Sequence, residues 1–210
     1  KDTDRQSLID LRKALLHLHK TLLEWERTAY ERIHGRTSPG ALLTALMNDP
    51  QFAWLRPLTN ITVITPADPW ETAEAVKWAA QHDGPVYLRL SRMPVPALDV
   101  PNRVFRVGKA EVVRGGNDVT LIACGTTVHL AVAAAKSLAD DGIDARVLNM
   151  ATLNPLDDEA VAAAAATGAI VTVEEASVRG GLGGAVAEFT AAHQPVPVER
   201  VGFPGFLPTG

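Results

Sequence analysis

From residue 61 onward, short runs of β-branched and other apolar residues alternate with alanine-rich segments, and glycine or proline separates them. Short β-branched runs are typical of buried strands, and alanine-rich segments favour helices. Strands are expected at 61–65, 85–90, 119–123, 145–150, 169–173 and 197–201, with helices at 69–81, 126–140, 155–167 and 185–193. The alternation predicts an α/β fold with a doubly wound, mostly parallel sheet and helices on both of its faces.

Composition excludes several classes of protein. With 210 residues and 47% hydrophobic content, the chain can bury a substantial core in one or two domains. A formal net charge of -4 without clustered Lys and Arg argues against a nucleic-acid partner. Cys124 is the single cysteine, which excludes an internal disulfide and fits a reducing compartment. No apolar run reaches membrane-spanning length and no signal peptide is visible, so we expect a cytoplasmic protein without a membrane partner.

The first 59 residues differ from the rest. Apolar residues at steps of three or four predict a helix that ends near Gly35, and Ser38-Pro39 supplies a cap and a first-turn proline for a second helix that stops near Pro50. We therefore expect residues 1–59 to form a helical hairpin. Three histidines of this segment lack carboxylate partners at ligand spacing, and we predict no metal site from them: they are His17, His19 and His34.

Residues 60–99 predict one strand, helix, strand unit followed by the start of a linker. Asp68-Pro69 supplies an N-cap and a first-turn proline, and Glu71 completes a capping box. A right-handed crossover of this kind makes its two strands parallel. The proline-rich run 93–101 is expected to be extended.

Ser91 and Arg92 follow the second strand of that unit, at its carboxyl end. A hydroxyl and a guanidinium at this position could hold an anion, and phosphate suits the guanidinium fork. A surface salt bridge from Arg92 to Asp83 or Asp99 is the equally weighted alternative.

Residues 100–210 are expected to form a second α/β domain. It begins with a strand at 109–113, a turn at Gly115–Asp118 and a strand at 119–123, a spacing that suggests a hairpin. Asn154-Pro155 is expected to start a later helix through a cap and a first-turn proline.

The strand that ends in Glu174 and Glu175 leads into the turn Gly180–Gly184, which opens directly into a helix. Ligands and partners of open α/β sheets bind at this edge, so Glu174, Glu175, Gly180, Gly181 and Gly183 are candidate interface or edge residues. Neighbouring strand residues point to opposite faces, so one acid should face an interface or the turn's amides while the other is solvated or paired. The turn could also hold a nucleotide phosphate, although it lacks the dinucleotide fingerprint.

Several ordered runs resemble the transketolase family of thiamine-diphosphate enzymes, in particular the separate C-terminal subunits of split bacterial transketolases. These runs are Asn60–Pro69, Gly84–Arg92, Gly108–Val113, Asp118–Ala123, Ile143–Met150, Val173–Glu175 and Gly180–Gly183. The resemblance covers residues 60–210, as the end of a pyrimidine-binding domain and a transketolase C-terminal domain. Residues 1–59 show no likeness to the family.

The resemblance implies that Arg92, with Ser91 beside it, contacts the phosphate of a sugar substrate, and that residues 100–210 serve mainly in subunit packing. The complete enzyme would use thiamine diphosphate and magnesium to move a two-carbon ketol unit between sugar phosphates. The family's ring-activating glutamate has no counterpart here, so we expect no catalytic residue, no bound cofactor and no activity in this chain alone. Expected partners are further copies of the chain or a thiamine-diphosphate-binding N-terminal subunit. A non-catalytic assembly module is the alternative function.

Overall fold

The computed structural model describes residues 24, 25, 27–36, 38, 41, 45 and 61–204. The chain divides into two compact units, Lys1–Thr59 and Asn60–Gly210. In the first unit, residues 27–34 are helical and Gly35, with a φ of 80°, follows the helix, as the sequence predicts. Ser38 Oγ accepts a hydrogen bond of 3.3 Å from the Ala41 N–H, which agrees with its predicted capping role. The remainder of the predicted hairpin lies outside the described residues.

In this first helix, an aromatic ring and a histidine ring pack together. The ring of His34 stacks on that of Tyr30 at a centroid distance of 4.3 Å. Trp25 and Ile33 are among the apolar residues at steps of three or four that predict this helix, yet each side chain is 70% exposed. His17 and His19 lie outside the described residues.

The second unit has the α/β composition that the alternation predicts. Its strands are β1 (Thr62–Ile64), β2 (Val86–Leu88), β3 (Glu111–Arg114), β4 (Val119–Ala123), β5 (Ala145–Asn149), β6 (Thr152–Asn154), β7 (Ile170–Ser177) and β8 (Val198–Phe203). Its helices are α4 (Pro69–Ala79), α5 (Thr127–Asp140), α6 (Asp158–Ala165) and α7 (Leu182–His193). None of the helices among the described residues combines the length and apolar character that a bilayer crossing demands.

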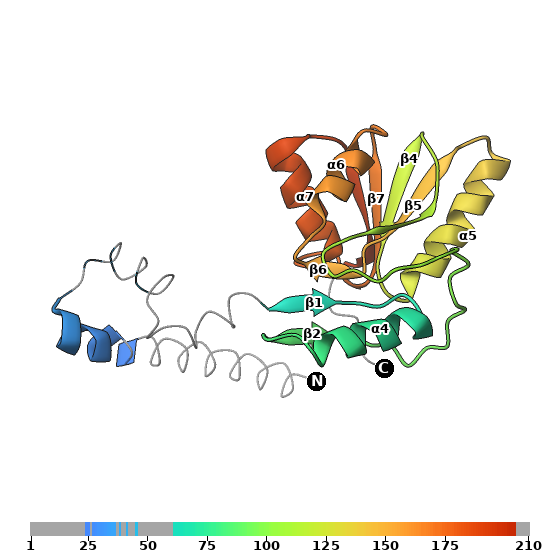
Figure 1. Cartoon of the computed structure of the whole chain (residues 1–210). Coiled ribbons are helices and arrows are strands. Elements are labelled where there is room, and N and C mark those ends of the chain that lie inside the picture. Colours follow the sequence, from blue (N-terminus) through green and yellow to red (C-terminus); the bar gives the residue numbers. More distant parts are fainter. Residues whose placement is uncertain are drawn as a thin grey trace, which may run out of the picture. The chain divides into compact units, whose positions relative to one another are not determined.

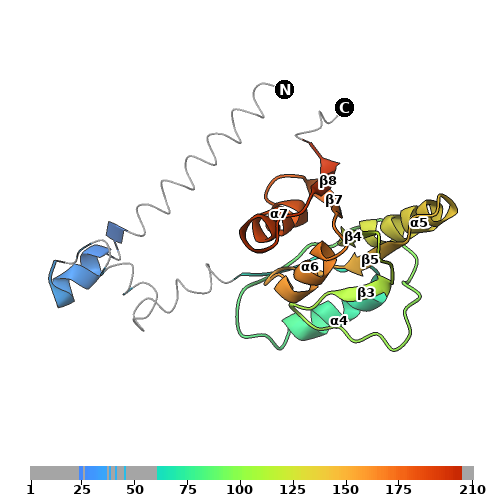
Figure 2. The same ribbon diagram turned by 90° about the horizontal axis from the view of Figure 1, so that it is seen from above.

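The larger sheet has five strands in the order β3-β5-β4-β7-β8, and all neighbours are parallel except β3 and β5. Helix α5 covers one face and helices α6 and α7 cover the other (Figures 1 and 2). Alternate residues of β4 point to opposite faces of the sheet. Leu121 and Ala123 pack with α5, whereas Ile122 packs with α6 and α7, as does Cys124 just after the strand. The doubly wound, mostly parallel prediction is confirmed.

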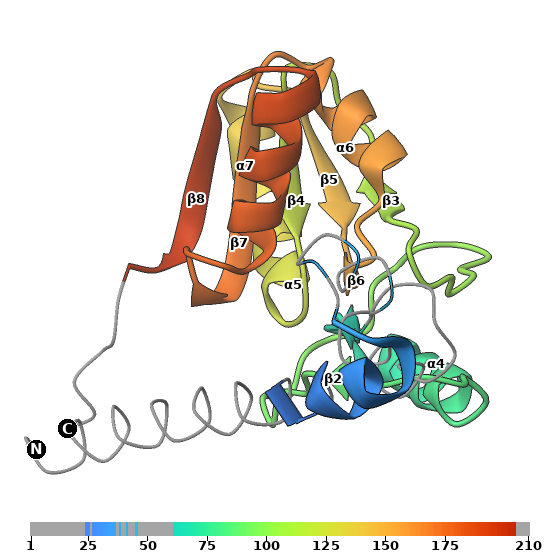
Figure 3. The ribbon, with the colours of Figure 1, turned by 90° about the vertical axis from the view of Figure 1, so that its left-hand side faces the viewer.

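A smaller sheet has three strands in the order β2-β1-β6. β1 and β2 are parallel and joined through α4, as predicted. β6 was not foreseen: it leaves the end of β5 and pairs antiparallel with β1, and Asn154 Nδ2 donates a 2.7 Å hydrogen bond to the carbonyl of Ile61. Residues on both sides of the predicted boundary at 99 and 100 therefore build one sheet, which lies beside the carboxyl ends of β4 and β5 (Figure 3).

Two local predictions are wrong. β3 and β4 do not form a hairpin, because β5 lies between them and pairs with both. The turn between β3 and β4 crosses the end of β5 so closely that a Cβ at Gly116 would overlap the Ala145 backbone. The helix expected at Asn154-Pro155 begins at Asp158 instead, because Asn154 is held in β6 and the carboxylate of Asp157 caps the Ala160 N–H at 3.2 Å.

Candidate functional site

The carboxyl ends of strands from both sheets meet around one cavity of about 200 Å³. Its polar lining comprises Thr65 after β1, Arg89 and Ser91 after β2, Gly125 and Thr126 after β4, and Glu175 on β7. Parallel strands deliver their carboxyl ends to the same edge, which is where α/β proteins bind ligands. The cavity is thus the candidate site that this fold would be expected to use.

Gly125 joins the carboxyl edges of the two sheets within this site. Its N–H donates a 3.1 Å hydrogen bond to the carbonyl of Thr65. Its φ of 61° is left-handed, and a Cβ there would come within 2.7 Å of Thr65 Cγ2. Glycine alone fits both requirements, so this residue fixes the distance between the two carboxyl edges.

The Glu174 side chain binds the first amides of α7 and does not line the cavity. Its side chain is buried and accepts hydrogen bonds from the Leu182 N–H at 2.9 Å and the Gly183 N–H at 2.8 Å. A carboxylate at a helix N-terminus satisfies orphan donors and the helix dipole. The prediction that one acid faces the turn's amides is confirmed. These two amides already have an acceptor, which argues against the nucleotide alternative.

Glu175 points to the other side of β7, as strand alternation requires. Its side chain is exposed and accepts a 2.6 Å hydrogen bond from the Thr126 hydroxyl. This agrees with the expected solvated or paired role of the second acid. Because Glu175 lines the cavity while Glu174 does not, the adjacent acids have separate tasks and cannot act together on one bond.

Arg89 is the charged residue of the cavity that sequence reasoning missed. Its Nη2 lies 3.6 Å from the sulfur of Cys124, which is fully buried. Burial raises the pKa of the Cys124 thiol to about 12, so the thiol stays neutral at physiological pH and acts as a small apolar group. The only sequence signal for Arg89 was its place at the end of the 85–90 run.

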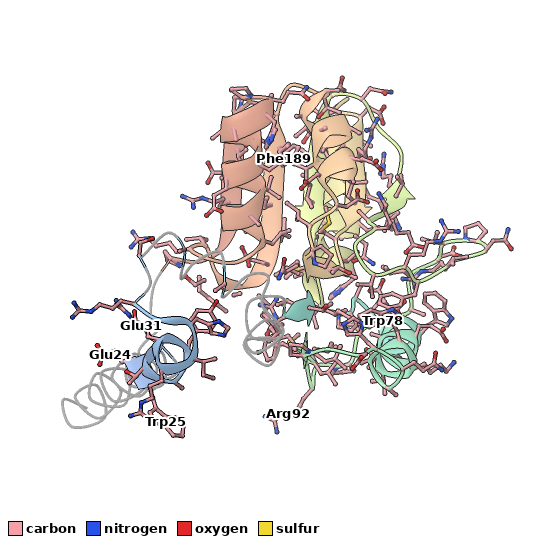
Figure 4. All side chains as sticks on the ribbon, turned by 60° about the vertical axis from the view of Figure 1, so that its left-hand side comes forward. Glu24, Trp25, Glu31, Trp78, Arg92 and Phe189 are labelled. Carbon is pink, nitrogen blue, oxygen red and sulfur yellow. The ribbon has the colours of Figure 1, made fainter. Side chains whose placement is uncertain are left out.

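Ser91 and Arg92 have different positions. Ser91 lines the cavity, and its Oγ accepts a 3.1 Å hydrogen bond from the Met93 N–H. Arg92 is exposed, is absent from the cavity lining, and extends away from the ribbon (Figure 4). Among the described ion pairs none joins Arg92 to Asp83 or Asp99. The phosphate contact assigned to Ser91 and Arg92 stays a prediction.

A second polar feature lies where the linker meets α4 and the larger sheet. Arg103 has a side chain only 7% exposed, and its guanidinium lies 2.6 Å from Asp68, 2.9 Å from Glu111 and 3.6 Å from Glu71. The same guanidinium lies 4.5 Å from the centre of the Trp70 ring. We call these five residues the Arg103 cluster. It joins the linker, the first turn of α4 and β3.

Two carboxylates of this cluster, Glu71 and Asp68, have pKa values shifted in opposite directions. Burial raises the pKa of Glu71, despite hydrogen bonds from the Ala67 N–H and Asn149. Burial acts in the same direction on Asp68, but two backbone N–H donors and Arg103 outweigh it and hold the pKa of Asp68 below its ordinary value. The structural role of Asp68 is thus larger than the predicted helix cap, since it also binds the linker.

Comparison with known proteins agrees with this α/β architecture and its shared carboxyl edges. Residues 108–209 match the family model "Transketolase, C-terminal domain", and residues 50–97 match "Transketolase, pyrimidine binding domain". The chain belongs to the transketolase family, as the sequence motifs imply. The pyrimidine-domain match begins at residue 50 and so includes the last part of the segment 1–59 that we set apart.

Curated relatives include two transketolase subunits. The "6-deoxy-6-sulfo-D-fructose transketolase subunit SqwH" of Clostridium sp. (strain MSTE9) is 47% identical over 149 residues, covering 70% of this chain and 46% of the relative. An apulose-4-phosphate transketolase subunit of Phocaeicola vulgatus is 39% identical over 174 residues, covering 82% of this chain and 55% of the relative. That second alignment is longer than the span 60–210, so it too extends upstream of residue 60.

A solved structure titled "Split gene transketolase, inactive beta4 tetramer" superposes with a TM-score of 0.67 and 46% identity, covering 70% of this chain and 49% of that one. The chain therefore spans about half the length of the relatives that it matches. Within them it corresponds to a C-terminal portion of a transketolase-type enzyme.

Proposed function

We propose that this chain acts within a transketolase-type enzyme that transfers a two-carbon ketol unit between anionic sugars. The principal support is the pair of family matches in the order pyrimidine-binding then C-terminal domain, together with a polar cavity at the carboxyl edges of both. The two curated relatives are named for transketolase activity on sulfo-sugar and sugar-phosphate compounds.

Thiamine diphosphate, which the family uses, does not fit the described residues of this chain as its sole binding site. The amides of Leu182 and Gly183, which open a helix and could take a diphosphate, already donate to Glu174. No cluster of three metal-binding side chains occurs among the residues that the structure describes. We propose that the cofactor and its magnesium are held mainly by a companion subunit.

In the complete assembly, Ser91 and Arg92 would contact the substrate's phosphate. Their place after β2, at the carboxyl edge, supports this role, as does the ability of guanidinium to bind oxyanions through two N–H donors. This chain's contribution would then be to hold and orient the substrate, which lowers the entropic part of the barrier.

Reconstitution tests the proposal. The purified chain is mixed with its cognate thiamine-diphosphate-binding subunit, and ketol transfer to ribose 5-phosphate is followed with xylulose 5-phosphate or hydroxypyruvate as donor. We expect activity only in the mixture. Arg92→Met should raise the KM for xylulose 5-phosphate about tenfold or more, since a charge-assisted contact is lost, and leave the KM for the donor without phosphate little changed. Equal effects on both donors would contradict the phosphate role.

A non-catalytic assembly module is the second candidate. The solved neighbour is described as a tetramer that is inactive, which favours self-association of such chains without catalysis. Sedimentation of the purified chain, with and without the companion subunit, separates the two functions. A stable homo-oligomer that neither exchanges with the companion nor binds thiamine diphosphate by calorimetry would favour the module.

A further inference from the structure

The cavity between the carboxyl edges presents a guanidinium whose charge no described carboxylate neutralises. Arg89 enters it from the end of β2, and no ion pair among the described residues includes Arg89. Among the described residues, its guanidinium makes one side-chain hydrogen bond, to the neutral Cys124 thiol at 3.6 Å. A half-buried cation with so weak a partner attracts an anion from solution more strongly than a paired one.

Three hydroxyl groups line the same cavity. Thr65 is buried, 3% exposed, and its Oγ1 has no hydrogen-bond partner in the described part of the chain. Ser91 and Thr126 add two further hydroxyls to the lining. A buried hydroxyl without a partner is rare in folded proteins, and a group bound in the cavity beside Thr65 would supply one.

The lining also includes a carboxylate, that of Glu175. Glu175 accepts the Thr126 hydroxyl at 2.6 Å and makes no ion pair with Arg89 among the described residues, although both line the same space. A carboxylate retains acceptor sites after one hydrogen bond and can accept a ligand's hydroxyl. The lining thus combines a guanidinium, which can bind an anion, with a carboxylate, which can accept a hydroxyl hydrogen bond.

The size of the cavity limits what it can take. At about 200 Å³ it is smaller than the roughly 300–1,000 Å³ of sites that enclose a whole small molecule. It suits one tetrahedral oxyanion with the adjoining hydroxylated carbon. A whole nucleotide would exceed this space.

We propose that Arg89 is an anion-binding residue of this cavity, taking the phosphate or sulfonate end of a hydroxylated substrate while Glu175 accepts a hydroxyl of the same molecule. The inference rests on the proposed function for its substrate class. It adds a second guanidinium to the exposed Arg92 and places the buried end of the anion at Arg89. Arg92 lies outside the lining, so its contact would be at the entrance.

The test is a titration of the purified chain with inorganic phosphate and, separately, methanesulfonate, followed by amide chemical shifts in NMR at low ionic strength. Saturable shifts are expected at the amides of Arg89, Gly125 and Thr126. Arg89→Met should weaken binding about tenfold or more, because a charged hydrogen-bond donor is lost. Arg114→Met, a β3 residue that does not line the cavity, should leave the dissociation constant within about twofold. The stronger of the two probes identifies phosphate or sulfonate as the preferred end group.

Arg89→Lys is the control for misfolding of the methionine variant, since it keeps the positive charge and removes the planar guanidinium. We expect it to retain the native amide spectrum and to bind several-fold more weakly than the wild type. Unsaturable shifts in the wild type would overturn the proposal, and so would equal affinity in the wild type and both Arg89 variants. No companion subunit or cofactor enters this measurement, so failure of ketol transfer in the reconstituted enzyme would not affect its result.

Discussion

Substituting methionine for Arg103 removes the guanidinium that three carboxylates share, and we expect a large loss of stability. Removing one partner of a buried ion pair costs about 3–5 kcal/mol, because the remaining charge is left in a poorly solvated site. Arg103 is 7% exposed and the Asp68 side chain 0% exposed, so solvent screens this pair little. Asp68 keeps backbone donors from Glu71 and Leu98, which places the expected loss near the lower value, about 3 kcal/mol.

The dependence of this loss on pH tests the electrostatic reasoning. Arg103 favours the ionised forms of Asp68 and Glu71, so its removal raises the pKa of both in the folded state. The folded variant then binds protons more tightly than the folded wild type, so its stability relative to the wild type rises as pH falls. The difference between wild type and Arg103→Met should therefore be larger at pH 7 than at pH 5.

Urea unfolding is followed by circular dichroism at the two pH values, and its midpoint and slope give the free energy of unfolding. The comparison measures both the loss of stability and its dependence on pH. Arg106→Met is the matched control, because Arg106 is an exposed arginine of the same linker, and it should change stability by no more than about 0.5 kcal/mol. If Arg103→Met lowers the midpoint no more than the control does, the cluster does not stabilise the fold. An equal loss at pH 7 and pH 5 would refute the ionic explanation and leave packing as the cause.

Three further outcomes are expected. Gly181→Ala should cost about 1–3 kcal/mol in urea unfolding, because its Cβ would overlap the Glu174 carboxylate, whereas Gly184→Ala has open space in α7 and should gain up to about 1 kcal/mol. Cys124, with a pKa of about 12, should react with a thiol reagent at pH 8 only after unfolding. Glu71→Gln should gain stability relative to wild type between pH 4 and pH 7, since burial raises the pKa of Glu71 and its ionisation opposes folding; a constant difference would contradict this.

Local chemistry was sufficient to predict most elements of the second unit. The Asp68 cap begins α4, and Gly142 and Gly168 follow α5 and α6 with left-handed φ values of 79° and 87°. The separate tasks of Glu174 and Glu175 followed from strand alternation alone. Caps, helix-ending glycines and strand alternation depend on residues a few positions apart in the sequence, so they can be recognised without knowledge of the fold.

Pairing across long sequence distances could not be predicted in the same way. The spacing of β3 and β4 permits a hairpin, and only the insertion of β5 between them excludes it. β6 is three residues long and gains its strand conformation from β1, about ninety residues earlier in the chain. The hydrogen bond between Asn149 and Glu71 joins residues 78 apart. These contacts depend on tertiary packing, which overrides local propensity.

Arg89 and Arg92 illustrate the same limit within the site. Both follow β2, three residues apart, and both could bind an oxyanion by chemistry alone. Arg89 lines the cavity and Arg92 does not. This difference depends on β6 and Gly125, which bring the small sheet against the edge of the large one and so enclose the cavity between them. The guanidinium of the lining, that of Arg89, therefore comes from the small sheet, and the Glu175 carboxylate comes from the large one. Because these two groups belong to different sheets, the contacts that join the sheets set the distance between them. That distance in turn sets the spacing between an anion and a hydroxyl that the proposed site accepts.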